Sequence, residues 1–399
     1  MTSPRTPQMI LHVGAPKCGS SALQTALSAT PDLRDAQGVR YCYTSVHNSA
    51  GTWHVEEGRQ VTRHARLSPY GYASWADFGP AGVSASDILD VIEQTLIKGK
   101  KWGHVPILSN ESWISHPSQF ADALARWGNP PVDVVVFLRP VVDWINAAFW
   151  QWGVWHTANL DTWMARSNMP YRFADDIAAW AQIPNVRLIV RSQRPDVVAK
   201  FADIYGLDIN AECQTNTASS AILIGVLLRN RSFRSTGHDG SIEFVVQRWC
   251  PPIPGRKLWS VLSRHVRALR PVCDATLETL CSVLPAQDVE DLLVDPRWMR
   301  EAPYHADILE GVTQLNDPAL FSPLFHALCS GVEVASQAVG IVAPDLPECP
   351  PEGSDIATWD AAICHVLKAL IETDKKVRQA TLPRWQQVGF DMLTRLSKR

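Results

Sequence analysis

The feature that most constrains this chain of 399 residues is an early apolar run followed by a turn between two glycines. The run at residues 9–13, Met-Ile-Leu-His-Val, is typical of a buried strand in a parallel sheet. The turn runs from Gly14 to Gly19 with Lys17 inside it, and a serine pair at 20–21 then opens a segment of good helix formers. Strand, turn and helix N-terminus predict an anion site, because the turn amides, the helix dipole and the lysine all favour negative charge there.

The spacing of this turn differs from that of the commonest phosphate-binding loop. A Walker A motif reads G-x-x-x-x-G-K-[ST], with the lysine directly before the hydroxyl residue. Gly14 and Gly19 keep the glycine spacing, but Lys17 lies inside the turn and Ser20 takes the usual lysine position. We expect an anion-binding loop in which Ser20 or Ser21 caps the first helical turn. The alternative is a tight strand-to-helix turn whose lysine is merely solvated.

Composition argues against several classes of protein. A net charge of −3 does not suit a general nucleic-acid binder. Nine cysteines without a C-x-x-C pair argue against a disulfide framework and against a zinc site, and they favour the reducing cytoplasm. The apolar run near the N-terminus is too short for a signal peptide or a membrane span. We therefore expect a soluble, cytoplasmic protein without a metal.

Strand and helix patterns alternate through the first half of the chain. Strands are expected at 38–43, 105–109, 132–138 and 185–191, and helices at 22–28, 86–98, 119–127, 142–155 and 195–205. This alternation predicts an α/β fold with a mostly parallel sheet flanked by helices. Residues 44–85 show little periodicity and are predicted to be an irregular loop or a lid.

Beyond about residue 220 the patterns become helical. Helices are predicted at 221–228, 260–269, 275–284, 288–293 and 356–377. We expect a main ligand-binding domain over residues 1–300 and a helical C-terminal extension over 301–399. The extension is either a cap on the main domain or the contact surface of a homodimer.

Chemically active residue types follow three of the predicted strands. In open α/β sheets ligands bind beyond the carboxyl ends of the strands, where the loop at 14–21, Glu111 and Arg139 would meet. Glu111 is the candidate general base, although it could instead cap the next segment or pair with a cation. His12 is the second candidate base, although a histidine in an apolar run is more often a core residue. Arg139 could bind an anion or form a structural ion pair.

The loop G-x-P-K-x-G-S-S resembles the 5′-phosphosulfate loop of sulfotransferases that use 3′-phosphoadenosine 5′-phosphosulfate (PAPS). It is closest to the bacterial branch, which acts on sugars and other hydroxyl acceptors. The resemblance continues after the strand at 132–138, with matches at Arg139, Asp143, Trp144, Gln151 and Trp152. It covers residues 8–220, extends loosely to about 300, and is absent from the tail.

This resemblance implies a P-loop sulfotransferase-like fold, and an enzyme that moves a sulfuryl group from PAPS to a hydroxyl of a carbohydrate or glycolipid. Lys17 would be catalytic, with Glu111 as the base used by the carbohydrate-type members. The donor-binding residues would be Gly14, Ala15, Pro16, Lys17, Cys18, Gly19, Ser20, Ser21 and Arg139.

The sequence departs from the family pattern at two positions near Arg139. Ala147 stands where a serine is expected to help Arg139 hold the 3′-phosphate, and Phe149 where a tyrosine is usual. Loss of that hydroxyl would cost a hydrogen bond worth roughly 1.5–3 kcal/mol if nothing replaces it. The segment Gly255-Arg256-Lys257 is similar to the R-K-G that closes over this phosphate, but it lacks the final glycine and could be a solvated basic turn.

Candidates for the acceptor pocket come from the predicted irregular segment. They are His47, Trp53, His54 and Trp75, each of which could equally be a surface-loop residue. Two other functions stay open: a P-loop nucleotide or small-molecule kinase, which would need a lysine where Ser20 stands, and a non-catalytic nucleotide-binding relative, for which Ala147 is the best argument.

Overall fold

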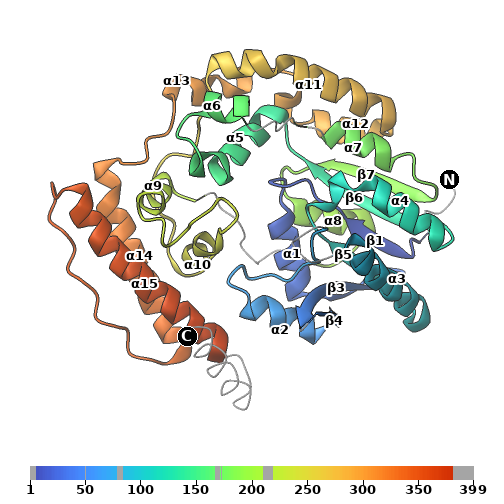
Figure 1. The fold of residues 1–399 in the computed structure, drawn as a ribbon, viewed down its shortest axis with the longest axis horizontal. Helices are drawn as coiled ribbons and strands as arrows, with labels where there is room; N and C mark the ends of the chain where they lie inside the picture. Colours follow the sequence, from blue (N-terminus) through green and yellow to red (C-terminus); the bar gives the residue numbers. More distant parts are fainter. Residues whose placement is uncertain are drawn as a thin grey trace.

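The computed structural model describes residues 6–49, 51–78, 84–166, 171, 173–209 and 219–380. Within these residues seven strands form one mixed, mostly parallel sheet flanked by helices, and the C-terminal part is helical (Figure 1). The strands are β1 Met9–His12, β2 Asp32–Arg34, β3 Arg40–Ser49, β4 Thr52–Glu57, β5 Val105–Ser109, β6 Val132–Leu138 and β7 Val186–Ser192. The predicted α/β class is confirmed.

The parallel part of the sheet has the order β3-β5-β1-β6-β7. Strands β2 and β4 both pair antiparallel with β3, at the edge of the sheet. All residues of β1, β5 and β6 are buried, as expected for apolar strands covered on both faces. The carboxyl ends of the five parallel strands therefore lie along one edge of the sheet.

Helices cover the sheet in two groups (Figure 1). Helices α1 (Ser20–Ala29), α2 (Arg59–Leu67) and α8 (Val197–Tyr205) pack on one face, and α3 (Ala85–Trp102), α4 (Pro117–Arg126) and α7 (Phe173–Trp180) on the other. Helix α5 (Val141–Gln151) follows β6 directly. Helices α6 (Leu160–Arg166), α11 (Ser263–Val283) and α12 (Ala286–Leu293) extend the second group.

The prediction of an irregular segment at 44–85 is wrong for residues 44–49 and 51–67, and residues 68–78 are irregular as predicted. Strand β3 continues to Ser49 and pairs with β4, after which α2 begins at Arg59. This hairpin is held by cross-strand pairing, a tertiary interaction that weak local patterns do not reveal. Helix α3 is capped by the Ser84 side chain, which accepts a hydrogen bond from the Ser86 amide.

A second difference lies in the region beyond residue 220. The helices predicted at 260–269 and 275–284 are one helix, α11, with Pro271 inside it. Helices α9 (Ala221–Arg229) and α10 (Ser241–Trp249) lie between the sheet and the C-terminal pair (Figure 1). Tyr304, past the predicted domain boundary, is buried and donates a hydrogen bond to Asp143 at 3.0 Å.

The C-terminal part is built on a pair of long helices, α14 (Phe321–Val339) and α15 (Ile356–Ala380), which pack along each other and against α10 (Figure 1). Trp359 of α15 stacks on Phe321 of α14. One described segment, Pro318–Val339, is long and apolar enough to cross a membrane, but half of it is buried inside the protein, as in an ordinary core helix. It is weak evidence for a membrane span.

Candidate functional site

The loop after β1 depends on its two glycines. Gly14 has φ +84°, and a Cβ there would lie 2.3 Å from the Cα of Glu111. Gly19 has φ +100°, and a Cβ there would lie 2.6 Å from Cγ1 of Val197. Both positions combine a left-handed backbone with a close approach to a neighbouring loop, so only glycine fits. The loop is thereby packed tightly against the segments that follow β5 and β7.

The N-terminus of α1 has no side-chain cap. Gly19 is the N-cap residue, and the first turn contains no acidic side chain. The expected cap by Ser20 or Ser21 is therefore wrong. The Ser20 hydroxyl is buried and makes no hydrogen bond of ordinary geometry to the described residues. A helix N-terminus without a capping side chain is a favourable place for an anion.

A cavity of about 640 Å³ lies at this helix end. It is formed by the segments that follow four adjacent parallel strands, β5, β1, β6 and β7, together with α5, α10 and residues 257–258. The lining includes six of the predicted site residues, namely Lys17, Gly19, Ser20, Ser21, Glu111 and Arg139. The other loop residues support it from behind: Gly14, Ala15 and Cys18 are buried, and the Pro16 carbonyl accepts a hydrogen bond from Trp144 Nε1 at 2.8 Å.

Lys17 lies in the loop just before α1, and its φ of +64° is unusual for a residue with a side chain. Its Nζ lies 5.8 Å from the centre of the Trp152 ring, and it forms no ion pair with a carboxylate of the described residues. Burial lowers the pKa of Lys17, while the charges of Glu111 and Glu243 oppose that shift. Lys17 is thus a cation without a tight protein partner, facing a cavity.

Glu111 faces the same cavity from the end of β5. Burial raises the pKa of the Glu111 carboxyl, and Asp77 adds to the shift. The nearby Lys17 ammonium and Ser20 hydroxyl oppose it. A carboxyl whose pKa is raised in this way holds a proton more firmly once it accepts one, which suits a general base.

Arg139 reaches the cavity from the end of β6. Its guanidinium donates to Oε1 of Gln193 at 2.9 Å, while its Nε is buried without a hydrogen-bond partner among the described residues. Arg139 forms no ion pair with a carboxylate of the described residues. The alternative role of Arg139 as a structural ion-pair residue is therefore not seen. At least one N–H donor of Arg139 is available for a ligand.

Ala147 of α5, which follows Arg139 in the sequence by eight residues, lines the cavity. The neighbouring Asn146 does not replace the missing hydroxyl, because its amide bonds to the carbonyl of Leu258 and to the amide and hydroxyl of Ser260. Those bonds instead hold the 258–260 segment against α5, which places Lys257 in the cavity wall.

The two basic residues of the turn at 255–257 have different roles. Arg256 donates to the carbonyls of Asp307, Glu310 and Gly311, so it is a structural residue. Lys257 lines the cavity, with its Nζ 5.2 Å from the centre of the Trp259 ring and 3.8 Å from Asp307.

Four residues predicted at the site lie elsewhere. His12 is buried in the sheet, where its Nδ1 lies 2.7 Å from Oγ of Ser109, and burial lowers its pKa to about 3. It is a neutral core residue without access to the cavity. His47, Trp53 and His54 belong to the β3–β4 hairpin and do not line the cavity. The sequence predicts an irregular loop or a lid at these residues, whereas cross-strand pairing holds them on the hairpin.

Trp75, the fourth residue proposed for the acceptor pocket, is buried. Its Nε1 donates to the Thr44 carbonyl at 3.0 Å. It is a structural residue beneath the hairpin.

Sequence reasoning missed the far wall of the cavity. That wall includes Tyr72, His238 and Glu243, together with Arg194 from the segment after β7. Glu243 pairs with the buried Arg234, which lies over the Trp155 ring. No local motif marks these residues, since they come from separate segments that meet only in the folded chain.

The fold and site define an α/β protein with a cavity lined by basic and acidic side chains at the carboxyl ends of a mostly parallel sheet. Comparisons with protein-family models, with curated proteins and with solved structures gave no match for this chain.

Proposed function

We propose that this protein is a PAPS-dependent sulfotransferase with a P-loop sulfotransferase-like fold, transferring a sulfuryl group to a hydroxyl of a carbohydrate or glycolipid. The observation that carries the proposal is that Lys17, Glu111 and Arg139, from three strand ends, line one cavity. The resemblance of the loop at 14–21 to the phosphosulfate loop supports the choice of donor. The cavity, at about 640 Å³, is within the usual range for a nucleotide-sized ligand.

The donor would bind along the β1–α1 loop. The uncapped N-terminus of α1, the Ser20 and Ser21 hydroxyls and the Lys17 ammonium are all suited to the 5′-phosphosulfate. Arg139, with its unpartnered Nε, and Lys257 are suited to the 3′-phosphate. The cavity is also lined by four acidic residues, Glu111, Asp143, Asp196 and Glu243. Binding of an anionic donor would therefore depend on its direct contacts with Lys17, Arg139 and Lys257.

The transfer step needs little covalent chemistry from the protein. A bond forms between the acceptor oxygen and sulfur while the bond between sulfur and the bridging phosphate oxygen breaks. Glu111 accepts the acceptor proton, and adenosine 3′,5′-bisphosphate leaves with the bonding electron pair. Lys17 stabilises the negative charge that develops on the leaving phosphate, as expected for a loose, in-line transfer.

Calorimetric titration with adenosine 3′,5′-bisphosphate in magnesium-free buffer tests the proposal. We expect one molecule bound per chain, and weaker binding by Lys17→Ala than by the control Lys101→Ala, an exposed lysine on α3. With PAPS and an acceptor, Lys17→Ala should lower turnover by about a hundredfold to a thousandfold.

Three results would overturn all or part of the proposal. Binding of Mg-ATP instead would indicate a kinase. Binding of the bisphosphate without turnover on any sugar or lipid acceptor would indicate the non-catalytic relative that Ala147 suggests. A Lys17→Ala variant with normal turnover would remove the proposed role of the loop.

A further inference from the structure

Two groups of metal-ligating side chains lie outside the cavity, both on the β3–β4 hairpin and its neighbours. One is Cys42, Glu57 and His104, and the other is His47, Glu56 and His64. In each group the candidate ligand atoms lie within 4.8 Å of one another. The two groups differ in whether neighbouring side chains already satisfy the oxygens of the carboxylate.

In the histidine group the carboxylate already has partners. Glu56 pairs with Nδ1 of His64 at 2.6 Å and accepts from the Ser45 hydroxyl at 3.0 Å, while Nδ1 of His47, 3.2 Å from Glu56, makes no hydrogen bond to the described residues. These contacts also lower the pKa of Glu56 against the effect of burial. The carboxylate is therefore satisfied without an ion.

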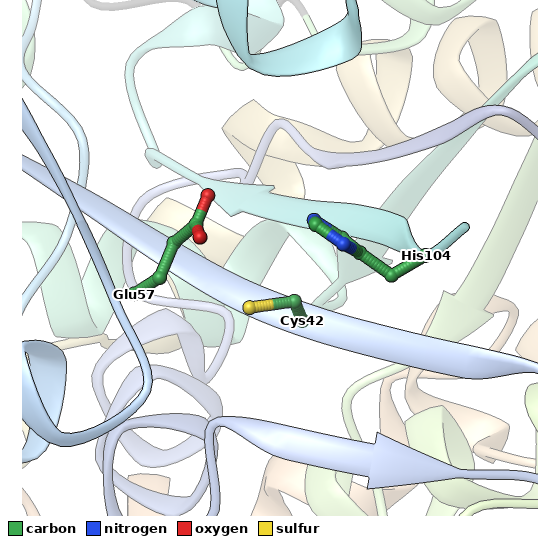
Figure 2. A group of neighbouring side chains, drawn as sticks. All are labelled: Cys42, Glu57 and His104. Carbon is green, nitrogen blue, oxygen red and sulfur yellow. The ribbon is translucent and has the colours of Figure 1, made fainter. Parts of the chain in front are cut away.

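The cysteine group lacks such bonds. Nε2 of His104 and Oε1 of Glu57 are buried atoms without a hydrogen-bond partner in the described parts of the chain. Figure 2 shows the imidazole, the carboxylate and the thiol around one small space. Cys42 is only 5% exposed; its Sγ lies 3.8 Å from the Tyr43 carbonyl and also interacts with the Asp32 carboxylate and the Gly58 backbone. Two unsatisfied buried polar atoms facing the same space require an explanation.

Three different elements bring these residues together. Cys42 lies in β3, between its cross-strand partners Asp32 of β2 and Pro106 of β5. Glu57 is the last residue of β4. His104 follows Gly103, whose left-handed backbone ends α3 and turns the chain into β5.

We propose that Cys42 Sγ, Glu57 Oε1 and His104 Nε2 bind a zinc ion as its three protein ligands. Thiolate, imidazole and carboxylate together are the ligand types that zinc prefers, whereas magnesium and calcium prefer oxygen alone. Around tetrahedral zinc the ligand atoms lie about 3.3–3.6 Å apart, so side-chain movements on the order of an ångström close the observed spacing.

The charges around the group bear on this site. Glu57 and Asp32 favour a cation, while Lys98 and Arg40 oppose one; Lys98 pairs with the other oxygen of Glu57 at 2.9 Å and so leaves Oε1 available. Burial, with help from Glu57, raises the pKa of the Cys42 thiol to about 12. Zinc binding would release that proton, because a coordinated thiol is held as the thiolate.

The ion would have a structural role. It would tie the end of β4 to β3 and to the turn between α3 and β5. This is the edge of the sheet at which β2 and β4 pair antiparallel with β3. Cys42, Glu57 and His104 do not line the cavity, so this inference is independent of the proposed sulfotransferase activity.

Cobalt titration of the metal-free full-length protein tests the site, because Co²⁺ replaces zinc and reports a thiolate ligand by a charge-transfer band in the near ultraviolet. We expect one equivalent of Co²⁺ to produce the band and one equivalent of Zn²⁺ to remove it. The band should be lost in Cys42→Ser and kept in Cys281→Ser, a matched change at an exposed cysteine. Zinc should also raise the melting temperature of the wild type but not of Cys42→Ser.

His104→Gln serves if Cys42→Ser does not fold, since His104 is only partly buried and the change is conservative. It should weaken zinc binding at least tenfold. The proposal fails if no band forms, if the band persists in both Cys42→Ser and His104→Gln, or if cobalt binds without a thiolate band and is lost in His64→Ala, which would place the ion in the histidine group.

Discussion

At the scale of single residues, burial pushes the two central ionisable groups of the cavity toward their neutral forms. It lowers the pKa of Lys17 and raises that of Glu111, and the charge of each partly reverses the effect on the other. The proposed transfer needs the opposite state, a charged Lys17 and an ionised Glu111. An anionic donor would favour the charged lysine, so donor binding and the ionisation of Lys17 are linked.

Glu111→Gln should reduce turnover far more than donor affinity, because the amide keeps the shape of the side chain but cannot accept the acceptor proton. In the wild type, turnover should rise with pH, since the base works only when unprotonated. The raised pKa of Glu111 moves this rise to a higher pH than an ordinary glutamate would show. Steady-state rates across pH, with calorimetry of the donor product, measure both effects. Equal loss of donor binding would place Glu111 in the nucleotide site instead.

Ala147→Ser should strengthen binding of adenosine 3′,5′-bisphosphate. Ala147 lines the cavity, and Asn146 is committed to Leu258 and Ser260, so a hydroxyl at 147 would be new to the site. A hydrogen bond to a charged phosphate is worth about 1.5–3 kcal/mol, or roughly tenfold to a hundredfold in affinity. Ala179→Ser, on the exposed side of α7, is the control and should change nothing. An unaltered affinity at 147 would mean that the 3′-phosphate binds elsewhere.

At the scale of elements, the site depends on how closely the β1–α1 loop approaches the loops after β5 and β7. Gly14 lies against the backbone of Glu111 and Gly19 against Val197, so no Cβ fits between these segments. The two glycines thus set the distance between the β1–α1 loop and Glu111. This close packing is also what leaves the first turn of α1 facing the cavity.

Gly14→Ala should destabilise the protein much more than Gly38→Ala. Both glycines have φ +84°, so both substitutions carry the left-handed strain of about 1–2 kcal/mol. Gly38 has open space around it, whereas at Gly14 the new methyl group would overlap the backbone of Glu111. Urea unfolding of the two variants isolates the steric part as the difference between them. Equal losses would show that the loop yields freely at this position.

At the scale of the whole molecule, one buried carboxylate joins the C-terminal helices to the rest of the protein. Asp374 of α15 is fully buried and accepts hydrogen bonds from Arg248 and Trp249 of α10 and from Arg378. Arg248 also donates a hydrogen bond to the carbonyl of Pro69, just after α2, and Arg378 donates one to the carbonyl of Leu67, the last residue of α2. The C-terminal helices are thereby connected to α10, which carries cavity residues, and to the hairpin side of the sheet.

Asp374→Ala should lower the free energy of unfolding by about 3–5 kcal/mol, because it leaves two arginines without their buried partner. The control is Asp355→Ala, an exposed residue that accepts from the amide of Thr358 at the start of α15, and its effect should be smaller. Chemical denaturation followed by circular dichroism measures both. A cost for Asp374→Ala no larger than that of the control would mean that the C-terminal helices contribute little to stability.

The site residues that could be predicted are those that lie close in the sequence to a recognisable strand pattern. Lys17, Ser20, Ser21, Glu111 and Arg139 were predicted because each follows directly on an apolar strand, and strand ends in a parallel sheet meet at one edge. His47, Trp53 and His54 were misplaced because the pairing of β3 with β4 is a contact between segments that lack strong alternation. The Cys42, Glu57 and His104 group was missed, and a zinc site was argued against, because its residues follow no motif spacing.

The sequence by itself determined the α/β class, the parallel core strands and the strand–turn–helix with Lys17 inside it. These depend on apolar periodicity and on glycine positions, which act over a few neighbouring residues. Only the tertiary structure decided that α10 and the segment at 257–258 complete the cavity, that the Asn146 amide bonds to Leu258 and Ser260, and that Cys42 meets Glu57 and His104. Those outcomes depend on packing between segments far apart in the chain, for which a linear pattern carries no distance information.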